Sequence, residues 1–407
     1  DYFLLIGPPG TGKTSCALKK MVETFHADKD AQILLLSYTN RAVDEICKSL
    51  ASIAPAVDFI RVGSELSCDE AYRGHLIENE LSSCNRRSEV YERIRNCRII
   101  VGTVAAISGK PELFRLKHFD VAIIDEATQI LEPQLLGILC ARGEDGKDAI
   151  DKFVLIGDHK QLPAVVQQNT EQSAIYDESL LSIGLTNLKD SLFERLYRNC
   201  TATVHRSYDM LCRQGRMHPE VALFANRAFY GGRLIPVGLP HQIESSDTIC
   251  RLAFYPSVPE KAGASAKINY SEARIVADLA ARIYEDHQTD FDESRTLGII
   301  TPYRSQIALI KKEIESLGIP ALNRILVDTV ERFQGSERDV IIYSFCVNYP
   351  YQLKFLSNLT EEEGVLIDRK LNVALTRARK QMFITGVPEL LERNPLYKSL
   401  LKLIEGS

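Results

Sequence analysis

The chain has no tryptophan, no C-x-x-C pair and no apolar run long enough to cross a membrane. Its ten cysteines are scattered, which gives little support to a zinc site or an iron–sulfur cluster and is typical of free thiols in a reducing compartment. We therefore expect no membrane partner and an intracellular protein, either cytoplasmic or nuclear. Basic residues are not in excess, because the chain has 49 Lys and Arg against 54 Asp and Glu. Nucleic acid could therefore bind only through a local basic groove.

The length of 407 residues exceeds what one hydrophobic core supports and predicts two or three domains. Runs such as Ile33-Leu34-Leu35-Leu36 are apolar on both faces, as in parallel strands covered by helices on either side. The strand candidates, which alternate with helical stretches, are residues 3–6, 33–38, 99–101, 121–124, 153–156, 297–300, 325–327, 340–345 and 382–385. This pattern predicts an α/β protein with two doubly wound domains, residues 1–205 and 206–407.

Two further segments differ in composition from the rest. Residues 64–97 are polar, charge-rich and helical in spacing, so they are either a solvated helical insertion in the first domain or a small subdomain that touches a substrate. Residues 243–269 are rich in Ser, Pro, Ala and Gly, which predicts a surface loop. Only Asp1 and Tyr2 precede the first strand candidate, so we expect further sequence upstream, with room for additional domains.

One motif carries most of the functional information. Residues 7–15 read GPPGTGKTS, which contains G-x-x-x-x-G-K-T between a strand candidate and a helical pattern at residues 17–25. In such a loop backbone N–H groups surround phosphates, the lysine binds the terminal phosphates, and the Thr hydroxyl can ligate Mg²⁺. The motif predicts an NTPase that binds its nucleotide through Gly7, Pro8, Gly10, Thr11, Gly12, Lys13, Thr14 and Ser15, with Thr14 also at the metal.

Acidic and basic residues elsewhere suit phosphoryl transfer. Asp125 and Glu126 end an apolar run, where Asp125 would hold Mg²⁺ and Glu126 would deprotonate the attacking water. Gln161 follows the next strand and can contact the γ-phosphate, although a polar turn explains that segment taken alone. Arg216 and Arg377 supply the cations that the transition state needs, so binding of ATP would draw the second domain toward the first.

Eight segments in order resemble a known family: GPPGTGKT, SYTNRAVDEI, IIDEAT, GDHKQLP, QGRMHP, GIITPYRSQ, VDTVERFQGSERDVII and LNVALTRAR. They are similar to the motifs of superfamily 1 helicases, in the branch of the up-frameshift, senataxin and replication-associated nuclease-helicases, from residue 3 to about residue 386. The resemblance implies two tandem RecA-like P-loop domains, ATP and Mg²⁺ between them, and movement along single-stranded DNA or RNA, typically 5′ to 3′. It also implies that Gln161 senses the γ-phosphate, that Arg216 and Arg377 are arginine fingers, and that Gly335 and Glu337 lie beside the nucleotide.

The same resemblance places contacts with a nucleic-acid strand at the ends of sheet strands. Short hydroxyl and amide groups there would bind phosphate and sugar without reading bases, although each alone is an ordinary helix cap or turn residue. The implied contacts are Thr39, Asn40, Thr103, Thr301, Pro302, Tyr303, Gln306 and Thr329.

The chain departs from the family at Gly215, where many members carry an aromatic residue that stacks on adenine. Tyr38, Tyr303 or a residue upstream would then have to recognise the base. Two other functions fit the phosphate loop: an ATP-switched nucleic-acid clamp or assembly module that does not unwind, and a signalling NTPase unrelated to nucleic acid. The second of these leaves the implied strand contacts without a purpose.

Overall fold

The computed structural model describes residues 1–203, 206–245, 249–260, 265–362 and 364–406. The chain forms two compact units, each with its own parallel sheet. Unit 1 comprises Asp1–His159 and Pro163–Leu211, and unit 2 comprises Lys160–Leu162 and Cys212–Ser407. The division after Leu211 lies a few residues beyond the expected boundary, and the three residues Lys160–Leu162 group with unit 2 although their neighbours on both sides group with unit 1.

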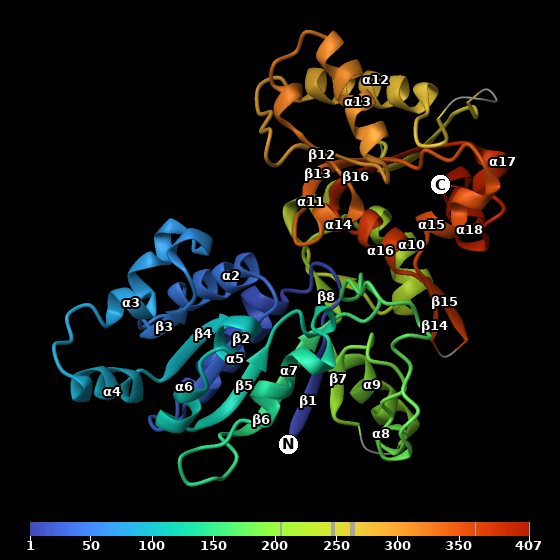
Figure 1. Ribbon diagram of the computed structural model, residues 1–407. Coiled ribbons are helices and arrows are strands. Elements are labelled where there is room, and N and C mark those ends of the chain that lie inside the picture. Colours follow the sequence, from blue (N-terminus) through green and yellow to red (C-terminus); the bar gives the residue numbers. More distant parts are fainter. Residues whose placement is uncertain (204–205, 246–248, 261–264, 363, 407) are drawn as a thin grey trace. The chain divides into compact units, whose positions relative to one another are not determined.

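The sheet of unit 1 has the strand order β3-β4-β2-β5-β6-β1-β7 within the described ranges, and all its neighbouring strands are parallel (Figure 1). Its strands are β1 (Tyr2–Ile6), β2 (Ile33–Ser37), β3 (Phe59–Val62), β4 (Ile99–Thr103), β5 (Phe119–Ile124), β6 (Ile150–Gly157) and β7 (Tyr208–Met210). Parallel neighbours need crossover connections, so every polar loop that follows a strand opens at the same edge of the sheet.

Alternate residues of these strands enter two cores, one on each face of the sheet. Leu35 and Ile123 pack with α1 and α2, while Leu36 and Ile124 pack with α5, α6, α7 and α9. The helical elements of unit 1 are η1 (Lys13–Leu18), α1 (Lys19–His26), α2 (Asn40–Ala51), η2 (Glu65–Ser67), η3 (Glu70–His75), α3 (Ile77–Glu80), α4 (Arg87–Asn96), α5 (Val104–Ser108), α6 (Pro111–Leu116), η4 (Ala127–Gln129), α7 (Glu132–Leu139), α8 (Glu178–Ser182) and α9 (Leu192–Ala202). The polar stretch at residues 64–97 thus contains η2, η3, α3 and α4, directly after β3.

The sheet of unit 2 has the order β10-β16-β13-β11-β12, again with parallel neighbours throughout its described strands. Its strands are β10 (Leu252–Pro256), β11 (Leu297–Ile300), β12 (Leu326–Asp328), β13 (Arg338–Ser344) and β16 (Ala378–Gly386). Two small pairs accompany it: β8 (Arg213–Gln214) with β9 (Ile235–Pro236), and β14 (Leu359–Glu362) with β15 (Val365–Asp368).

Helices cover both faces of this second sheet as well. Figure 1 shows α12 and α13 on one side of it and α10, α14 and α16 on the other. The helical elements are α10 (Pro219–Tyr230), α11 (Pro240–Ile243), α12 (Tyr270–Asp286), α13 (Arg304–Ser316), η5 (Leu322–Arg324), α14 (Val330–Phe333), η6 (Pro350–Gln352), α15 (Leu353–Leu356), α16 (Arg369–Leu375), α17 (Pro388–Leu391) and α18 (Pro395–Glu405). The prediction of α/β domains with parallel sheets covered on both faces is therefore confirmed.

One local prediction is wrong. Residues 243–269 were expected to form a surface loop, yet Leu252–Pro256 within them is strand β10, which pairs with β16 from Leu252↔Met382 to Pro256↔Gly386. The Ser- and Pro-rich composition masks this strand, because its stability comes from a partner more than a hundred residues away in the sequence. Residues 246–248 and 261–264 of that stretch lie outside the described residues. No helix along the described part of the chain is long and apolar enough to span a bilayer.

Candidate nucleotide and nucleic-acid site

The phosphate loop leaves β1 at the carboxyl edge of the unit 1 sheet. Gly10 and Gly12 have φ of 73° and 74°, a backbone conformation that glycine adopts without strain. Gly7 has no room for a side chain, since a Cβ there would lie 2.1 Å from Cγ of Lys13. The Lys13 Nζ donates to the Gly7 carbonyl at 2.9 Å, which folds the lysine back across the loop.

The two acidic residues after β5 meet this loop directly. Thr14 Oγ1 donates to Asp125 Oδ2 at 2.5 Å, so the two expected metal ligands are adjacent. Burial, together with the neighbouring Glu126 charge, raises the pKa of Asp125 to about 6, although the Thr14 hydrogen bond and Lys13 act in the opposite direction. Glu126 has φ of 54°, an uncommon conformation for a residue with a side chain, and such strain clusters at functional sites.

These residues fit a Mg²⁺–nucleotide in chemistry. A hydroxyl and a carboxylate are hard oxygen donors, which Mg²⁺ prefers, and Mg²⁺ is usually held by one or two carboxylates together with substrate phosphates. The described residues include no cluster of three or more His, Cys, Asp or Glu that could hold a metal ion. The phosphates would supply the remaining ligands.

Three supporting residues escaped the sequence analysis. Ser49 of α2 donates to the Thr14 carbonyl at 2.9 Å, and Ser37 at the end of β2 donates to the Asp125 carbonyl at 3.2 Å. Gln129 Nε2 donates to Glu126 Oε2 at 2.9 Å and so orients that carboxylate. Ser37 begins the segment SYTNRAVDEI and Gln129 directly follows IIDEAT, so their places beside motifs could have signalled a role, whereas Ser49 lies within α2 with no such signal.

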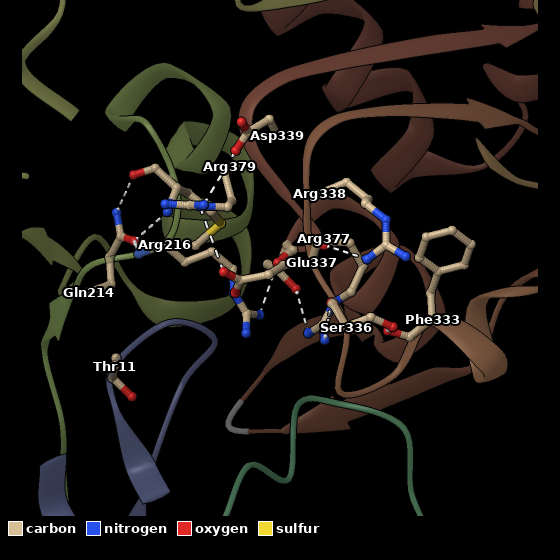
Figure 2. A network of polar contacts seen from close by, with 12 residues as sticks. Thr11, Gln214, Arg216, Phe333, Ser336, Glu337, Arg338, Asp339, Arg377 and Arg379 are labelled. Atoms are coloured by element: carbon tan, nitrogen blue, oxygen red, sulfur yellow. Dashed lines mark hydrogen bonds and ion pairs between the residues drawn. The ribbon is translucent and has the colours of Figure 1, made fainter. Parts of the chain in front are cut away.

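In unit 2 a network of polar contacts surrounds the two candidate arginine fingers (Figure 2). Arg377 is 2% exposed, and it donates through Nε to the Val373 carbonyl at 3.0 Å and through Nη2 to Gln161 Oε1 at 3.3 Å. The expected γ-phosphate sensor and one expected finger are therefore hydrogen-bonded to each other within the same unit. Asn372 reinforces this arrangement, because its Nδ2 donates to the Lys160 carbonyl at 2.7 Å.

Arg216 lies in the same network with a more accessible side chain. Its Nε donates to Glu337 Oε2 at 2.5 Å, and Arg379 pairs with the other oxygen of Glu337 at 3.7 Å (Figure 2). Gln214 Oε1 accepts from the Arg216 amide at 3.0 Å and fixes the backbone there. Glu337, expected beside the nucleotide, thus holds two arginines, and the exposed Gly335 lies two residues before it with φ of 78°.

The position of Gly215 is enclosed by aliphatic side chains. A Cβ at Gly215 would lie 3.3 Å from Leu239 Cδ1 and 3.4 Å from Val237 Cγ2, so these two side chains would have to shift slightly to admit a larger residue. Of the tyrosines considered as replacements for adenine stacking, Tyr38 is exposed, whereas the Tyr303 hydroxyl accepts from Gln352 Nε2 at 3.1 Å.

The implied strand contacts of unit 1 gather at one sheet edge. Thr39 caps α2 by accepting from the Ala42 amide at 3.2 Å, and Thr103 caps α5 by accepting from the Ala106 amide at 3.1 Å. Asn40 is the first residue of α2. Because β2 and β4 are neighbours, with Ser37 paired to Thr103, these side chains follow adjacent strand ends.

The implied contacts of unit 2 are less accessible. Thr301 is 0% exposed, and within the described residues its Oγ1 has no hydrogen-bond partner. Gln306 is also fully buried and uses both ends of its amide on the backbone of Asn269, at 2.8 and 3.0 Å. In this arrangement Gln306 stabilises the start of α12, and its contact with a nucleic-acid strand stays a prediction. Pro302, Tyr303 and Thr329 are partly exposed, and Thr329 precedes α14.

The motifs and their geometry agree with comparisons to known proteins. Two family models, each described as an AAA domain, match residues 188–389 and residues 1–90 with 77–169. The chain is 30% identical, over 98% of its length, to the DNA replication ATP-dependent helicase/nuclease DNA2 of Xenopus laevis, and 28% identical, over 98%, to the regulator of nonsense transcripts 1 homolog of Neurospora crassa. It spans 37% of the length of each of these two proteins.

Among solved structures, the chain is similar to the Arterivirus nonstructural protein 10 (helicase), with 14% identity, a TM-score of 0.48, and coverage of 94% of this chain and 59% of that one. The family models match most of both units, and the sequence relatives match nearly the whole chain. The chain therefore belongs to the superfamily 1 helicases, in the branch that contains the up-frameshift, senataxin and replication-associated nuclease-helicase proteins.

Proposed function

We propose that this chain is an ATP-dependent helicase or translocase that moves on single-stranded nucleic acid, in the 5′-to-3′ direction typical of its branch. The observation that carries the proposal is the 2.5 Å hydrogen bond between Thr14 and Asp125, which joins the phosphate loop to the acidic pair from a strand more than a hundred residues later. A loop, a metal carboxylate and an adjacent second carboxylate together are the parts that nucleotide hydrolysis requires.

Each residue has a stated role in the proposal. The backbone of residues 7–15 and Lys13 bind the phosphates, Thr14 and Asp125 hold Mg²⁺, and Glu126 deprotonates the attacking water. When bound, Mg²⁺ neutralises charge on the phosphates and orients them. Glu126 suits its role because Gln129 fixes its carboxylate while the side chain remains partly exposed.

Residues of unit 2 would respond to whether the γ-phosphate is present. Arg216 and Arg377 stabilise charge in the transition state, and Gln161 reports the γ-phosphate. Gln161 is bonded to Arg377, and this supports the proposal because a change at either side chain must disturb the other. Gly335 and Glu337 would lie beside the nucleotide, with Glu337 holding Arg216 in place.

Single-stranded DNA or RNA would lie along the carboxyl edges of both sheets, against Thr39, Asn40, Thr103, Pro302, Tyr303 and Thr329. With such a partner, the proposed site of action is the nucleus or the cytoplasm. The relatives carry names that refer both to DNA replication and to nonsense transcripts, so DNA and RNA are both tested as substrates.

The test is hydrolysis of Mg²⁺–ATP by the full-length protein with and without matched single-stranded DNA and RNA. We expect stimulation by at least one of them, and a loss of about 100- to 10,000-fold in Glu126→Gln, because a positioned general base contributes that much. Hydrolysis that does not respond to either oligonucleotide would contradict the proposal. Stimulated hydrolysis without strand displacement would instead identify an ATP-switched clamp.

A further inference from the structure

Aromatic residues gather beyond the carboxyl edge of the unit 2 sheet, in the segment that follows β13. The rings of Tyr349 and Tyr351 stack, with centroids 5.7 Å apart and an angle of 15° between their planes. Tyr351 is 55% exposed, and Phe355, in the short helix α15, is 69% exposed. Both side chains therefore expose much of their apolar surface to water, which is unfavourable in free energy. A partner that covers this surface would remove that unfavourable term.

A buried glutamine ties this segment to an implied strand contact. Gln352 is buried, and its Oε1 accepts from the amides of Asn348 and Tyr349 at 2.9 Å each. Its Nε2 donates to the Tyr303 hydroxyl at 3.1 Å. The aromatic segment is thus held in a fixed relation to Tyr303.

Sheet topology explains why these distant segments meet. β11 and β13 are neighbouring parallel strands, with Ile300 paired to Tyr343, so residues 301–303 and the aromatic segment leave the same sheet edge side by side. Two exposed basic residues adjoin these segments in the sequence: Arg304, which follows Tyr303, and Lys354, which precedes Phe355. Aromatic rings next to cationic side chains are the combination that binds single strands without sequence preference.

We propose that Tyr351 and Phe355 form a platform on which unpaired bases of a single strand stack. This inference rests on the proposed function, because it concerns the bases of the same strand whose backbone is proposed to lie against Pro302 and Tyr303. The hydroxyl and amide contacts hold phosphate and sugar, and the platform holds base faces of any sequence. The ring of Tyr349 stacks on the ring of Tyr351 and so restricts its rotation.

The experiment compares two labelled strands of equal length at one fixed salt concentration, an oligothymidine and a strand with an abasic site at every position. Both carry the same phosphates, so the ratio of their affinities reports base contacts alone. Wild-type protein is expected to prefer the base-containing strand by about 5- to 150-fold, which is the range for stacking of one base. The double variant Tyr351→Ala, Phe355→Ala should lose most of this preference while its affinity for the abasic strand stays unchanged.

Controls separate stacking from damage to the fold. Phe355→Tyr keeps a ring and should keep the preference, and Tyr176→Ala removes a tyrosine that is 81% exposed in unit 1 and should change neither affinity. Equal affinity of the wild-type protein for both strands would overturn the platform while leaving the backbone contacts, and so the proposed function, intact. A double variant that weakens both strands alike would also overturn it. Binding of neither strand would overturn the proposed function, and the platform with it.

Discussion

Lys13 at the carboxyl edge of the unit 1 sheet is partly exposed and donates to a carbonyl of its own loop, whereas Arg377 in unit 2 is buried and bonded to groups from several segments. The same contrast holds for the implied strand contacts: Thr39 is exposed, and Gln306 is fully buried. A side chain of the first kind can exchange its partner for a ligand with little effect on folding. A side chain of the second kind belongs to the polar interior, so its removal must cost stability as well as function.

The largest expected effect is on hydrolysis. Lys13→Ala should reduce the rate of ATP hydrolysis by about 100- to 1,000-fold, since it removes a preorganised cation from the phosphates. The midpoint of thermal unfolding should move by less than about 2 °C, because a partly exposed side chain with a single loop contact contributes little to folding. A steady-state assay and a thermal melt measure the two quantities. The control is the exposed Lys29→Ala, which should change neither, and a large loss of stability in Lys13→Ala would remove the contrast between the units.

Arg377→Ala should lower the free energy of unfolding by about 2–5 kcal/mol, measured in urea without nucleotide. The substitution leaves a cavity and deprives the Val373 and Ser336 carbonyls of a donor. Arg216→Ala is the matched comparison, and it should cost about 1 kcal/mol because its ion pair with Glu337 is partly solvated. Equal costs for the two variants would show that Arg377 is not held more firmly than Arg216.

Glu272 of α12 should make the stability of unit 2 depend on pH. Burial raises the pKa of its carboxyl group to about 7, against a value near 4.3 in an unfolded chain, while hydrogen bonds from Ser344 and the Cys346 amide oppose the shift. The folded state therefore keeps a proton that the unfolded state has lost. The stabilisation is complete below pH 4 and disappears as pH rises through about 7, for a total of about 4 kcal/mol.

The check is urea unfolding of wild-type protein and Glu272→Gln at pH 5 and pH 8. The neutral amide of the variant has no charge to bury. From pH 5 to pH 8 the free energy of unfolding of wild type should therefore fall relative to that of Glu272→Gln, by a large part of this energy. A stability difference that is the same at both pH values would show that Glu272 does not titrate in this window.

The smallest expected effect concerns Gln306. Gln306→Ala should lower the free energy of unfolding by about 1–3 kcal/mol, because it leaves the buried Asn269 amide without the acceptor that Gln306 provides. Affinity for an oligonucleotide, measured well below the unfolding temperature, should change little. The exposed Gln288→Ala serves as control. Lost affinity for the oligonucleotide with unchanged stability would show instead that Gln306 contacts the strand.

Much of this arrangement could be predicted from local sequence. Strands such as residues 297–300 are apolar on both faces, and the structure has β11 there. Because parallel strands end at one edge, the sequence also indicated that Thr14 and Asp125 would meet. Burial was harder to predict, because it depends on distant partners. Asn269 decides the environment of Gln306, and β16 decides that Leu252–Pro256 is a strand.

The three residues Lys160–Leu162 have a practical consequence for dividing this protein. The chain passes from one compact unit to the other after His159, after Leu162 and after Leu211. A cut between Leu211 and Cys212 would therefore leave the carboxyl-terminal piece without the Lys160 carbonyl for Asn372 and without Gln161 for Arg377. Unit 2 includes three residues that come from the first half of the sequence. A gene split at the apparent domain boundary would therefore encode an incomplete unit 2.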